Sequence, residues 1–254
     1  MSTLTSKNDH DKLKIRYRAT DGVVHLYNVD KFDSCSSMAV YKVPSAYSIA
    51  IDGSCSSQGG QIFTKIYQWD SSFGNWCLRR EVTGEKPYLN SGEVASKEYV
   101  SRVEGCFAPG DLRPPRYTPS TQSRKAVISQ LRYFRTIIKD EAAIKEFIRL
   151  FPFYSVAELV PYIDVNTVQE INDIAFYLSK YDRSYEAIRL LEHIVREFPE
   201  RFVAKLNLAD AYWTNGFESK AIPLYVAYEA KMNSLGLTKN IPSRVKNRQA
   251  AKEN

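Results

Sequence analysis

The sequence predicts an α+β protein, in which an N-terminal antiparallel β module precedes a C-terminal all-α stack of helical hairpins. Apolar residues alternate with period two in the first part of the chain and recur at helical spacing in the last part. Between them, residues 108–123 hold four prolines, which fix φ and lack an amide donor. We therefore expect a β module at 12–107, a linker at 108–123, a helical domain at 124–246 and a basic tail at 247–254.

The β module is predicted from alternation and turn residues. Ile15 and Tyr17 alternate with lysine and arginine, and Asp21-Gly22 then separates this run from a second one at residues 23–27. Asp-Gly between two strand-like runs is a strong hairpin signal. Further strand candidates lie at 38–43, 48–51, 61–69 and 76–82, with a hairpin loop at 70–75.

The helical domain is predicted from periodicity and capping residues. In residues 126–139, Val127, Leu131 and Phe134 share one face. Asn166 is a favourable N-cap for a helix at 167–180. Shorter helices are expected at 143–151 and 155–162, and a helix that caps the stack is expected at 235–245, with Ile241 and Val245 on one face.

Two segments of the helical domain match at a spacing of 34 residues. Ala175 pairs with Ala209, and Ala187 pairs with Ala221. Small residues at fixed points of two helices with this period resemble the tetratricopeptide repeat, with repeats at 168–201 and 202–235. The first repeat has Asp182 where the second has Gly216, which departs from the usual glycine. The resemblance implies a binding surface without chemistry of its own.

By the same resemblance, the first helix of each repeat lines a concave groove that holds a protein or peptide. The groove residues would be Asn172, Phe176, Lys180, Leu206, Asp210 and Trp213. Trp213 suits a partner anchor because it offers a large apolar area and one donor; the alternative is that it packs against the capping helix. Some family members clamp a peptide carboxylate, but Asp210 would repel that group, so no such clamp is predicted.

The four cysteines all lie in the β module, at Cys35, Cys55, Cys77 and Cys106. An even set in one domain favours disulfides, and we favour Cys35–Cys55 and Cys77–Cys106 because sequence neighbours bracket a hairpin most easily. The alternative is four reduced, buried thiols. Zinc is disfavoured because the short ligand spacing is missing.

The cysteines also bear on compartment. Disulfides indicate an oxidising compartment such as a bacterial periplasm or cell envelope, whereas reduced thiols, and a start without a secretory signal, would fit the cytoplasm. A cysteine-bearing β module followed by such hairpins resembles uncharacterised bacterial proteins.

Composition limits the function classes. The 254 residues carry a net charge of +6, but basic and acidic residues are mostly interspersed and no nucleic-acid motif is present, so no nucleic-acid partner is expected. No run approaches the roughly 20 apolar residues of a membrane span. His10, His25 and His193 form no pattern of a triad or metal site, and residues 53–60 lack the lysine of a P-loop.

These observations lead to a non-enzymatic adaptor that binds a protein or peptide through the helical groove, with no cofactor and no metal. The alternative is an immunity-type or inhibitory protein that binds a toxin or an enzyme through the β module. An enzyme of unknown class comes third.

Overall fold

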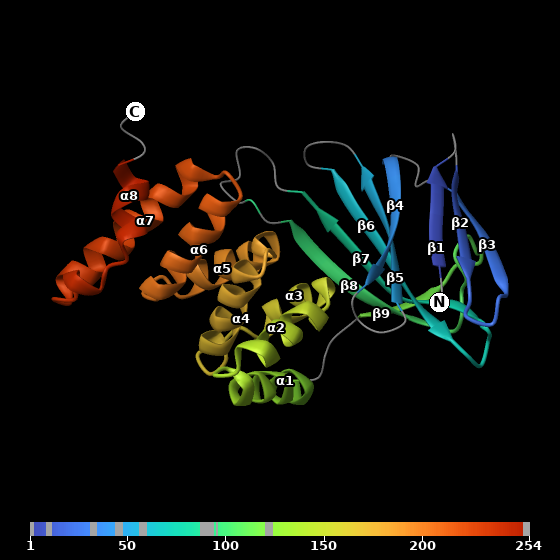
Figure 1. The fold of residues 1–254 in the computed structure, drawn as a ribbon, viewed down its shortest axis with the longest axis horizontal. Helices are drawn as coiled ribbons and strands as arrows, with labels where there is room; N and C mark the ends of the chain where they lie inside the picture. The colour runs from blue at the N-terminus through green and yellow to red at the C-terminus, as the bar shows by residue number, and fades with distance from the viewer. Residues whose placement is uncertain are drawn as a thin grey trace. The chain divides into compact units, whose positions relative to one another are not determined.

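The computed structural model describes residues 3–8, 12–30, 35–43, 48–55, 60–86, 94, 96–119 and 124–250. Within them, the predicted fold class is confirmed, since an antiparallel β region precedes a run of helices (Figure 1). The chain divides into two compact units. The β unit comprises Met1–Gln122 and Leu150–Glu158, and the helical unit comprises Ser123–Arg149 and Leu159–Asn254.

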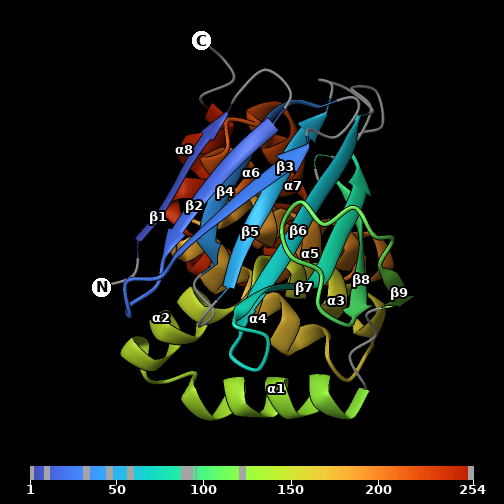
Figure 2. The ribbon, with the colours of Figure 1, turned by 90° about the vertical axis from the view of Figure 1, so that its right-hand side faces the viewer.

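The β unit contains two antiparallel sheets whose strands follow chain order (Figure 2). The smaller sheet holds β1 (Thr3–Asn8), β2 (Lys12–Arg18) and β3 (Val24–Asp30). The larger sheet holds β4 (Cys35–Val43), β5 (Ser48–Cys55), β6 (Gln61–Asp70), β7 (Asn75–Glu85), β8 (Lys97–Glu104) and β9 (Arg116–Pro119). The predicted Asp21-Gly22 hairpin is confirmed, because β2 pairs with β3 across it. Strand β1 precedes the predicted start of the module at residue 12; its polar sequence gave no apolar alternation to detect.

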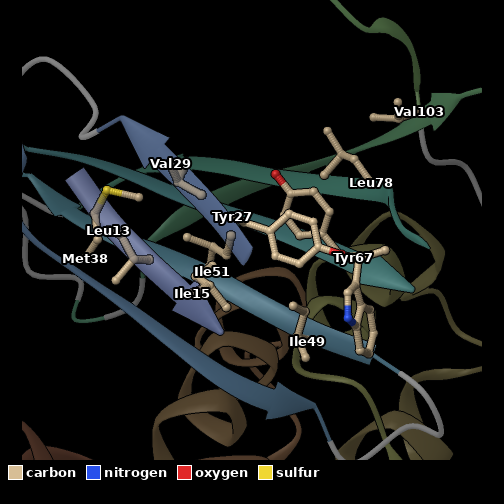
Figure 3. Close-up of a cluster of buried hydrophobic side chains, with 11 residues drawn as sticks. Leu13, Ile15, Tyr27, Val29, Met38, Ile49, Ile51, Tyr67, Leu78 and Val103 are labelled. Carbon is tan, nitrogen blue, oxygen red and sulfur yellow. The ribbon is translucent and has the colours of Figure 1, made fainter. Parts of the chain in front are cut away.

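One hydrophobic core joins the two sheets (Figure 3). The smaller sheet contributes Leu13 and Ile15 from β2, and Tyr27 and Val29 from β3. The larger sheet contributes Met38, Ile49, Ile51, Tyr67, Trp76, Leu78 and Val103. Each of these side chains is at most 9% exposed. Alternation along β2 and β3 therefore buries one face of the smaller sheet and leaves the other face to solvent.

A β-bulge in β7 redirects that strand between two cores. The register pairs Ile66 with Arg80 and Tyr67 with Leu78, so Arg79 is the extra residue. Leu78 therefore points into the core shared with the smaller sheet, whereas Val82 points to the opposite face. Strict alternation would have put both side chains on one face.

The second face of the larger sheet packs against helix α3 (Phe153–Leu159). Ile66 and Val82 form a cluster with Tyr154, and Phe153 packs against it. Residues 155–162 were predicted as one helix in the helical domain. They instead form the end of α3 and a 3-10 turn, η1 (Val160–Tyr162), with Pro161 inside the turn, and residues 150–158 belong to the β unit.

The predicted linker at 108–123 is also corrected, because its described residues are part of the β unit. The Phe107 carbonyl accepts a hydrogen bond from the Leu78 amide at 2.9 Å, and β9 pairs with β8 as an edge strand. Gly110 lies so close to β3 that a Cβ atom there would be 2.1 Å from the Asn28 carbonyl oxygen. The prolines shape this segment, but backbone bonds and close packing fix it in place.

The helical unit contains α1 (Arg124–Ile137), α2 (Glu141–Leu150), α4 (Val168–Lys180), α5 (Ser184–Glu197), α6 (Phe202–Thr214), α7 (Glu218–Ser234), η2 (Thr238–Asn240) and α8 (Ser243–Ala250). Helices α1 and α2 begin two residues earlier than predicted. In α2 the Asp140 carboxylate accepts a hydrogen bond from the Ala143 amide at 3.0 Å, which is an N-cap interaction. Asn166 is not the N-cap of α4. Thr167 takes that position and bonds the Tyr162 carbonyl instead.

The two helical hairpins, α4–α5 and α6–α7, repeat each other closely. Ala175, Ala187, Ala209 and Ala221 are all fully buried, as expected where two helices cross closely. Gly216 has φ +76°, and Asp182, which lies 34 residues earlier, has φ +62°. Aspartate therefore adopts the left-handed turn conformation that glycine adopts in the second hairpin. The repeat is a property of backbone geometry as well as of sequence.

Candidate binding site on the repeat helices

The six predicted groove residues lie on α4 and α6, but two of them are buried. Asn172 is 3% exposed, and its side-chain oxygen accepts a hydrogen bond from the Asn207 amide at 3.2 Å. Leu206 is 8% exposed. Asn172 thus links α4 to α6, and Leu206 is a core residue. The prediction that these two contact a partner is wrong, because their sides of the helices face other helices of the unit.

Phe176 and Lys180 lie on the exposed side of α4. The Phe176 ring is 41% exposed and packs edge-on against Tyr177, with 5.1 Å between the ring centroids. The Lys180 ammonium is 2.8 Å from a Glu141 carboxylate oxygen of α2 and lies over the Tyr177 and Tyr181 rings. Lys180 is therefore engaged within the unit, whereas Phe176 remains partly exposed to solvent.

Asp210 is the centre of a charged cluster built from three helices. Its carboxylate accepts hydrogen bonds from the Tyr225 hydroxyl of α7 at 2.7 Å and from two arginines of α8. Arg244 donates from Nη2 at 2.8 Å and from Nε at 3.1 Å, and Arg248 donates from Nη1 at 2.6 Å. Such charge-assisted, forked bonds are among the stronger polar contacts in proteins. We call Asp210, Trp213, Tyr225, Arg244 and Arg248 the Asp210 cluster.

The cluster controls the ionisation of its members. Burial raises the pKa of the Tyr225 hydroxyl, and its hydrogen bond to the Asp210 carboxylate raises that pKa further. The same carboxylate raises the pKa of the Arg244 guanidinium through a side-chain hydrogen bond. Tyr225 thus stays a neutral donor and Arg244 stays charged at physiological pH, which keeps α8 attached to α6 and α7.

Trp213 packs within this cluster. The guanidinium carbon of Arg248 lies 5.3 Å from the centroid of the Trp213 ring, and the Tyr225 ring lies 6.4 Å from it. The alternative that Trp213 packs against the helix that follows the repeats is therefore confirmed. Its indole forms a cation–π contact with α8, and the prediction of a partner anchor at Trp213 loses its support.

Helix α8 differs from the predicted cap. It begins at Ser243, and it extends through Arg248 to Ala250, part of the stretch that was predicted to be a tail from residue 247. Val245 is fully buried as expected. Sequence reasoning missed Tyr225, Arg244 and Arg248. The i, i+4 spacing of the two arginines, which places both on one helix face, was the available signal.

The Asp210→Asn variant tests the cluster. Losing the carboxylate charge leaves two guanidinium groups with a weaker acceptor, so the unfolding free energy of the helical unit should fall by about 1–2 kcal/mol, and α8 amides should exchange faster. Urea unfolding and hydrogen exchange measure both effects. Glu146→Gln is the control, because Glu146 forms an exposed pair with Arg149 within α2 and should cost under about 0.5 kcal/mol. Equal effects of both variants would contradict a special role for Asp210.

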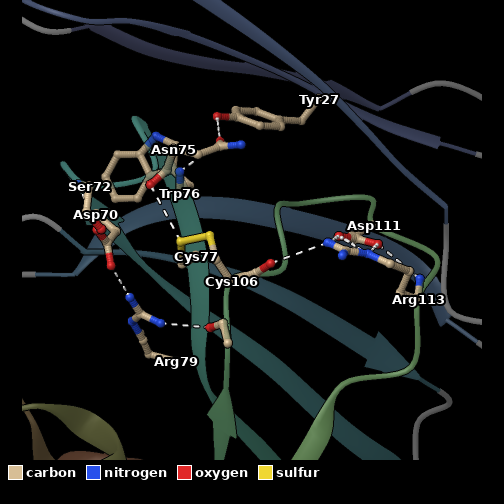
Figure 4. The surroundings of a disulfide bond; sticks show 11 residues. Tyr27, Asp70, Ser72, Asn75, Trp76, Cys77, Arg79, Cys106, Asp111 and Arg113 are labelled. Carbon is tan, nitrogen blue, oxygen red and sulfur yellow. Dashed lines mark hydrogen bonds and ion pairs between the residues drawn. A yellow bond between two sulfur atoms is a disulfide. The ribbon is translucent and has the colours of Figure 1, made fainter.

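In the β unit, the predicted pairing of Cys77 with Cys106 is confirmed (Figure 4). The disulfide joins β7 to the segment that follows β8, with 4.6 Å between the two Cα atoms. Arg79, the bulge residue, forms an ion pair with Asp70 and donates a hydrogen bond to the Gly105 carbonyl at 2.8 Å. Through its side chain, the bulge residue therefore makes a second contact with the segment that holds Cys106.

Cys35 and Cys55 are paired residues of the β4–β5 ladder. Directly opposite Cα atoms in an antiparallel ladder are about 4.5–5.5 Å apart, within the range that a disulfide spans. Their side chains lie outside the described residues, so this second disulfide stays a prediction.

The remaining candidates for chemistry are dispersed. His25 packs among aromatic rings of the β unit, His193 lies on α5 with its pKa lowered by burial, and His10 lies outside the described residues. In the described ranges, His, Cys, Asp and Glu side chains form no group of three that could hold a metal.

The first helices of the two hairpins, α4 and α6, thus present one exposed aromatic residue, Phe176, and one polar cluster that α8 occupies. None of the helices in the described ranges combines the length and the apolar character needed to cross a membrane. Comparison with protein-family models, with curated proteins and with solved structures finds no match to this chain.

Proposed function

We propose that the protein is a non-enzymatic adaptor that binds another protein through the exposed side of α4, in the manner of a tetratricopeptide-like repeat. The observation that carries the proposal is the exposed Phe176 ring on the first helix of the first hairpin. At 41% exposed, this ring is available for contact with a partner protein. Aromatic side chains are enriched at the centres of protein interfaces.

The repeat geometry supports this assignment. The two hairpins share buried alanines at a spacing of 34 residues and a left-handed residue at the same point of each turn, which are features of stacked helical repeats. Five of the six expected contacts are engaged inside the unit, namely Asn172, Lys180, Leu206, Asp210 and Trp213. The proposed surface therefore centres on Phe176 of α4.

Phe176→Ala tests the proposal. The variant should lower the amount of a specific partner that is captured from native extract by at least tenfold, because truncating a central aromatic contact removes about 2 kcal/mol or more of binding free energy. Quantitative mass spectrometry of the captured proteins measures the loss. The fold should be retained, since Phe176 lies on the surface of α4 and is 41% exposed.

Tyr185→Ala is the matched control. Tyr185 is a similarly exposed aromatic residue, 40% exposed, on the second helix of the same hairpin, and its replacement should leave capture unchanged. A partner retained equally by wild type and by Phe176→Ala would remove this surface from the function and point to the β unit, as an inhibitory protein would require.

A further inference from the structure

The outer face of the smaller sheet carries a row of exposed cations. Strand β2 points Leu13 and Ile15 into the core, so the alternate residues point outward. Lys7 of β1 lies opposite Lys14 in the ladder and shares that face. We call this surface the basic face, and its cations are Lys7, Lys12, Lys14, Arg16 and Arg18, all exposed.

The described residues of the three strands give this face one carboxylate. Asp30 is opposite Lys12, and the Lys12 ammonium lies 3.5 Å from its oxygen. Alternate side chains along a strand are about 7 Å apart, a separation shorter than the Debye length of about 8 Å at physiological salt. The cations of β2 therefore reinforce one another's electrostatic potential. Such a surface attracts a polyanion.

Exposed aliphatic side chains lie on the same face. Leu26 of β3 is opposite Arg16 and is 72% exposed, and Val24 is opposite Arg18 and is 38% exposed. Both residues lie in the half of β3 that is nearest to the β2–β3 turn. Apolar and cationic residues therefore alternate across neighbouring strands at the end of the face near this turn.

These side chains discriminate between two kinds of polyanion. Proteins that bind single-stranded nucleic acid stack bases on aromatic rings, but the aromatic residues of β2 and β3, Tyr17 and Tyr27, belong to the inward-facing set of the sheet. Leu26 and Val24 would gain nothing from a sugar–phosphate backbone. A bilayer interface offers both an anionic headgroup layer for the arginines and an apolar boundary for the aliphatic side chains.

We propose that the basic face docks the β unit on the surface of a membrane that contains anionic phospholipid. Arg16 and Arg18 contact headgroup phosphates, and Leu26 and Val24 enter the interfacial region beside them. This site is separate from the Phe176 surface and does not depend on the proposed function of α4.

Vesicle sedimentation of the full chain tests the proposal. Binding should appear with vesicles of phosphatidylcholine containing about one third phosphatidylglycerol, and it should be absent with phosphatidylcholine alone. Each cation near such a surface contributes about a fivefold factor in partitioning, so Arg16→Gln with Arg18→Gln should reduce binding about 25-fold. Raising the salt to about 0.5 M should also abolish binding.

Lys139→Gln with Lys145→Gln is the matched control, because both lysines are exposed residues of the helical unit and the change in net charge is the same. This variant should bind as wild type does. Leu26→Ser should weaken vesicle binding severalfold. Equal binding by the arginine pair variant and the lysine pair variant would overturn the proposal, as would binding to phosphatidylcholine alone. Tight binding of a single-stranded oligonucleotide that Leu26→Ser leaves intact would overturn it in favour of nucleic acid.

Discussion

Replacing Gly110 with alanine is expected to destabilise the β unit by about 4 kcal/mol. The residue has φ +83°, and an added Cβ would lie 2.1 Å from the Asn28 carbonyl oxygen of β3. Overpacking a well-packed site costs about 1–3 kcal/mol, and the left-handed conformation adds about 1–2 kcal/mol for a residue with a Cβ. Because the atom it meets belongs to the backbone of β3, relief requires a shift of either that strand or the 105–115 segment.

Gly74→Ala separates the two causes. Gly74 has φ +57° in the β6–β7 turn, and an added Cβ there has no atom within 4 Å, so this variant should cost only the conformational part, about 1 kcal/mol. Urea unfolding of the full chain measures both variants. Similar unfolding free energies for the two would mean that the segment around Gly110 does not pack against β3.

Removing the Cys77–Cys106 disulfide is expected to lower the unfolding free energy of the β unit by about 3–4 kcal/mol. The two cysteines are 29 residues apart in the sequence. In the chain-entropy model, closing a loop of that size lowers the entropy of the unfolded chain, which stabilises the folded state by about 3–4 kcal/mol. The double variant Cys77→Ala with Cys106→Ala is preferable to a reductant, since a reductant acts on every cystine of the chain.

Urea unfolding of the double variant measures the effect, and Cys106→Ala alone should show the same loss because either change removes the bond. Thiol counting on the unreduced wild-type protein supplies the control for the starting state. Free thiols at Cys77 and Cys106 would contradict the disulfide, and with it the support for the expected oxidising compartment.

The repeated hairpins could be predicted from the sequence because their determinants are local. The four alanines sit at a fixed period, and the turn residues mark the ends of the helices. Asp182 shows how far such reasoning extends. It lacks the glycine signal, yet the tertiary packing of α4 against α5 holds it at φ +62°.

The arrangement of the β unit could be predicted only in part, because some of its determinants are non-local. The residues around Arg79 have an ordinary strand pattern, so the sequence does not reveal the bulge. It is recognised only from the structure, in which Leu78 and Val82 pack into different cores on opposite faces of the sheet. The prolines before residue 120 correctly excluded a helix and a central strand, but they gave no sign that Gly110 packs against β3.

The surroundings of Asp210 and Trp213 could not be predicted from the sequence for a similar reason. The resemblance to a helical repeat placed Trp213 and Asp210 in a groove. Instead, α8 follows α7 and brings Arg248 to both residues and Arg244 to Asp210. Periodicity identifies which helix face a residue occupies, but it does not identify what covers the last repeat.

The assignment of Leu150–Glu158 to the β unit has a consequence for synthesis on the ribosome. The nascent chain finishes β9 at Pro119 and must then add α1 and α2 before Phe153 and Tyr154 exist to cover Ile66 and Val82. During that interval Ile66 and Val82 lack this cover, and transiently exposed apolar surface of this kind is prone to association. Helix α3 therefore covers Ile66 and Val82 only late in synthesis. A chain that is terminated near residue 122 lacks α3 and should aggregate more readily than the full chain.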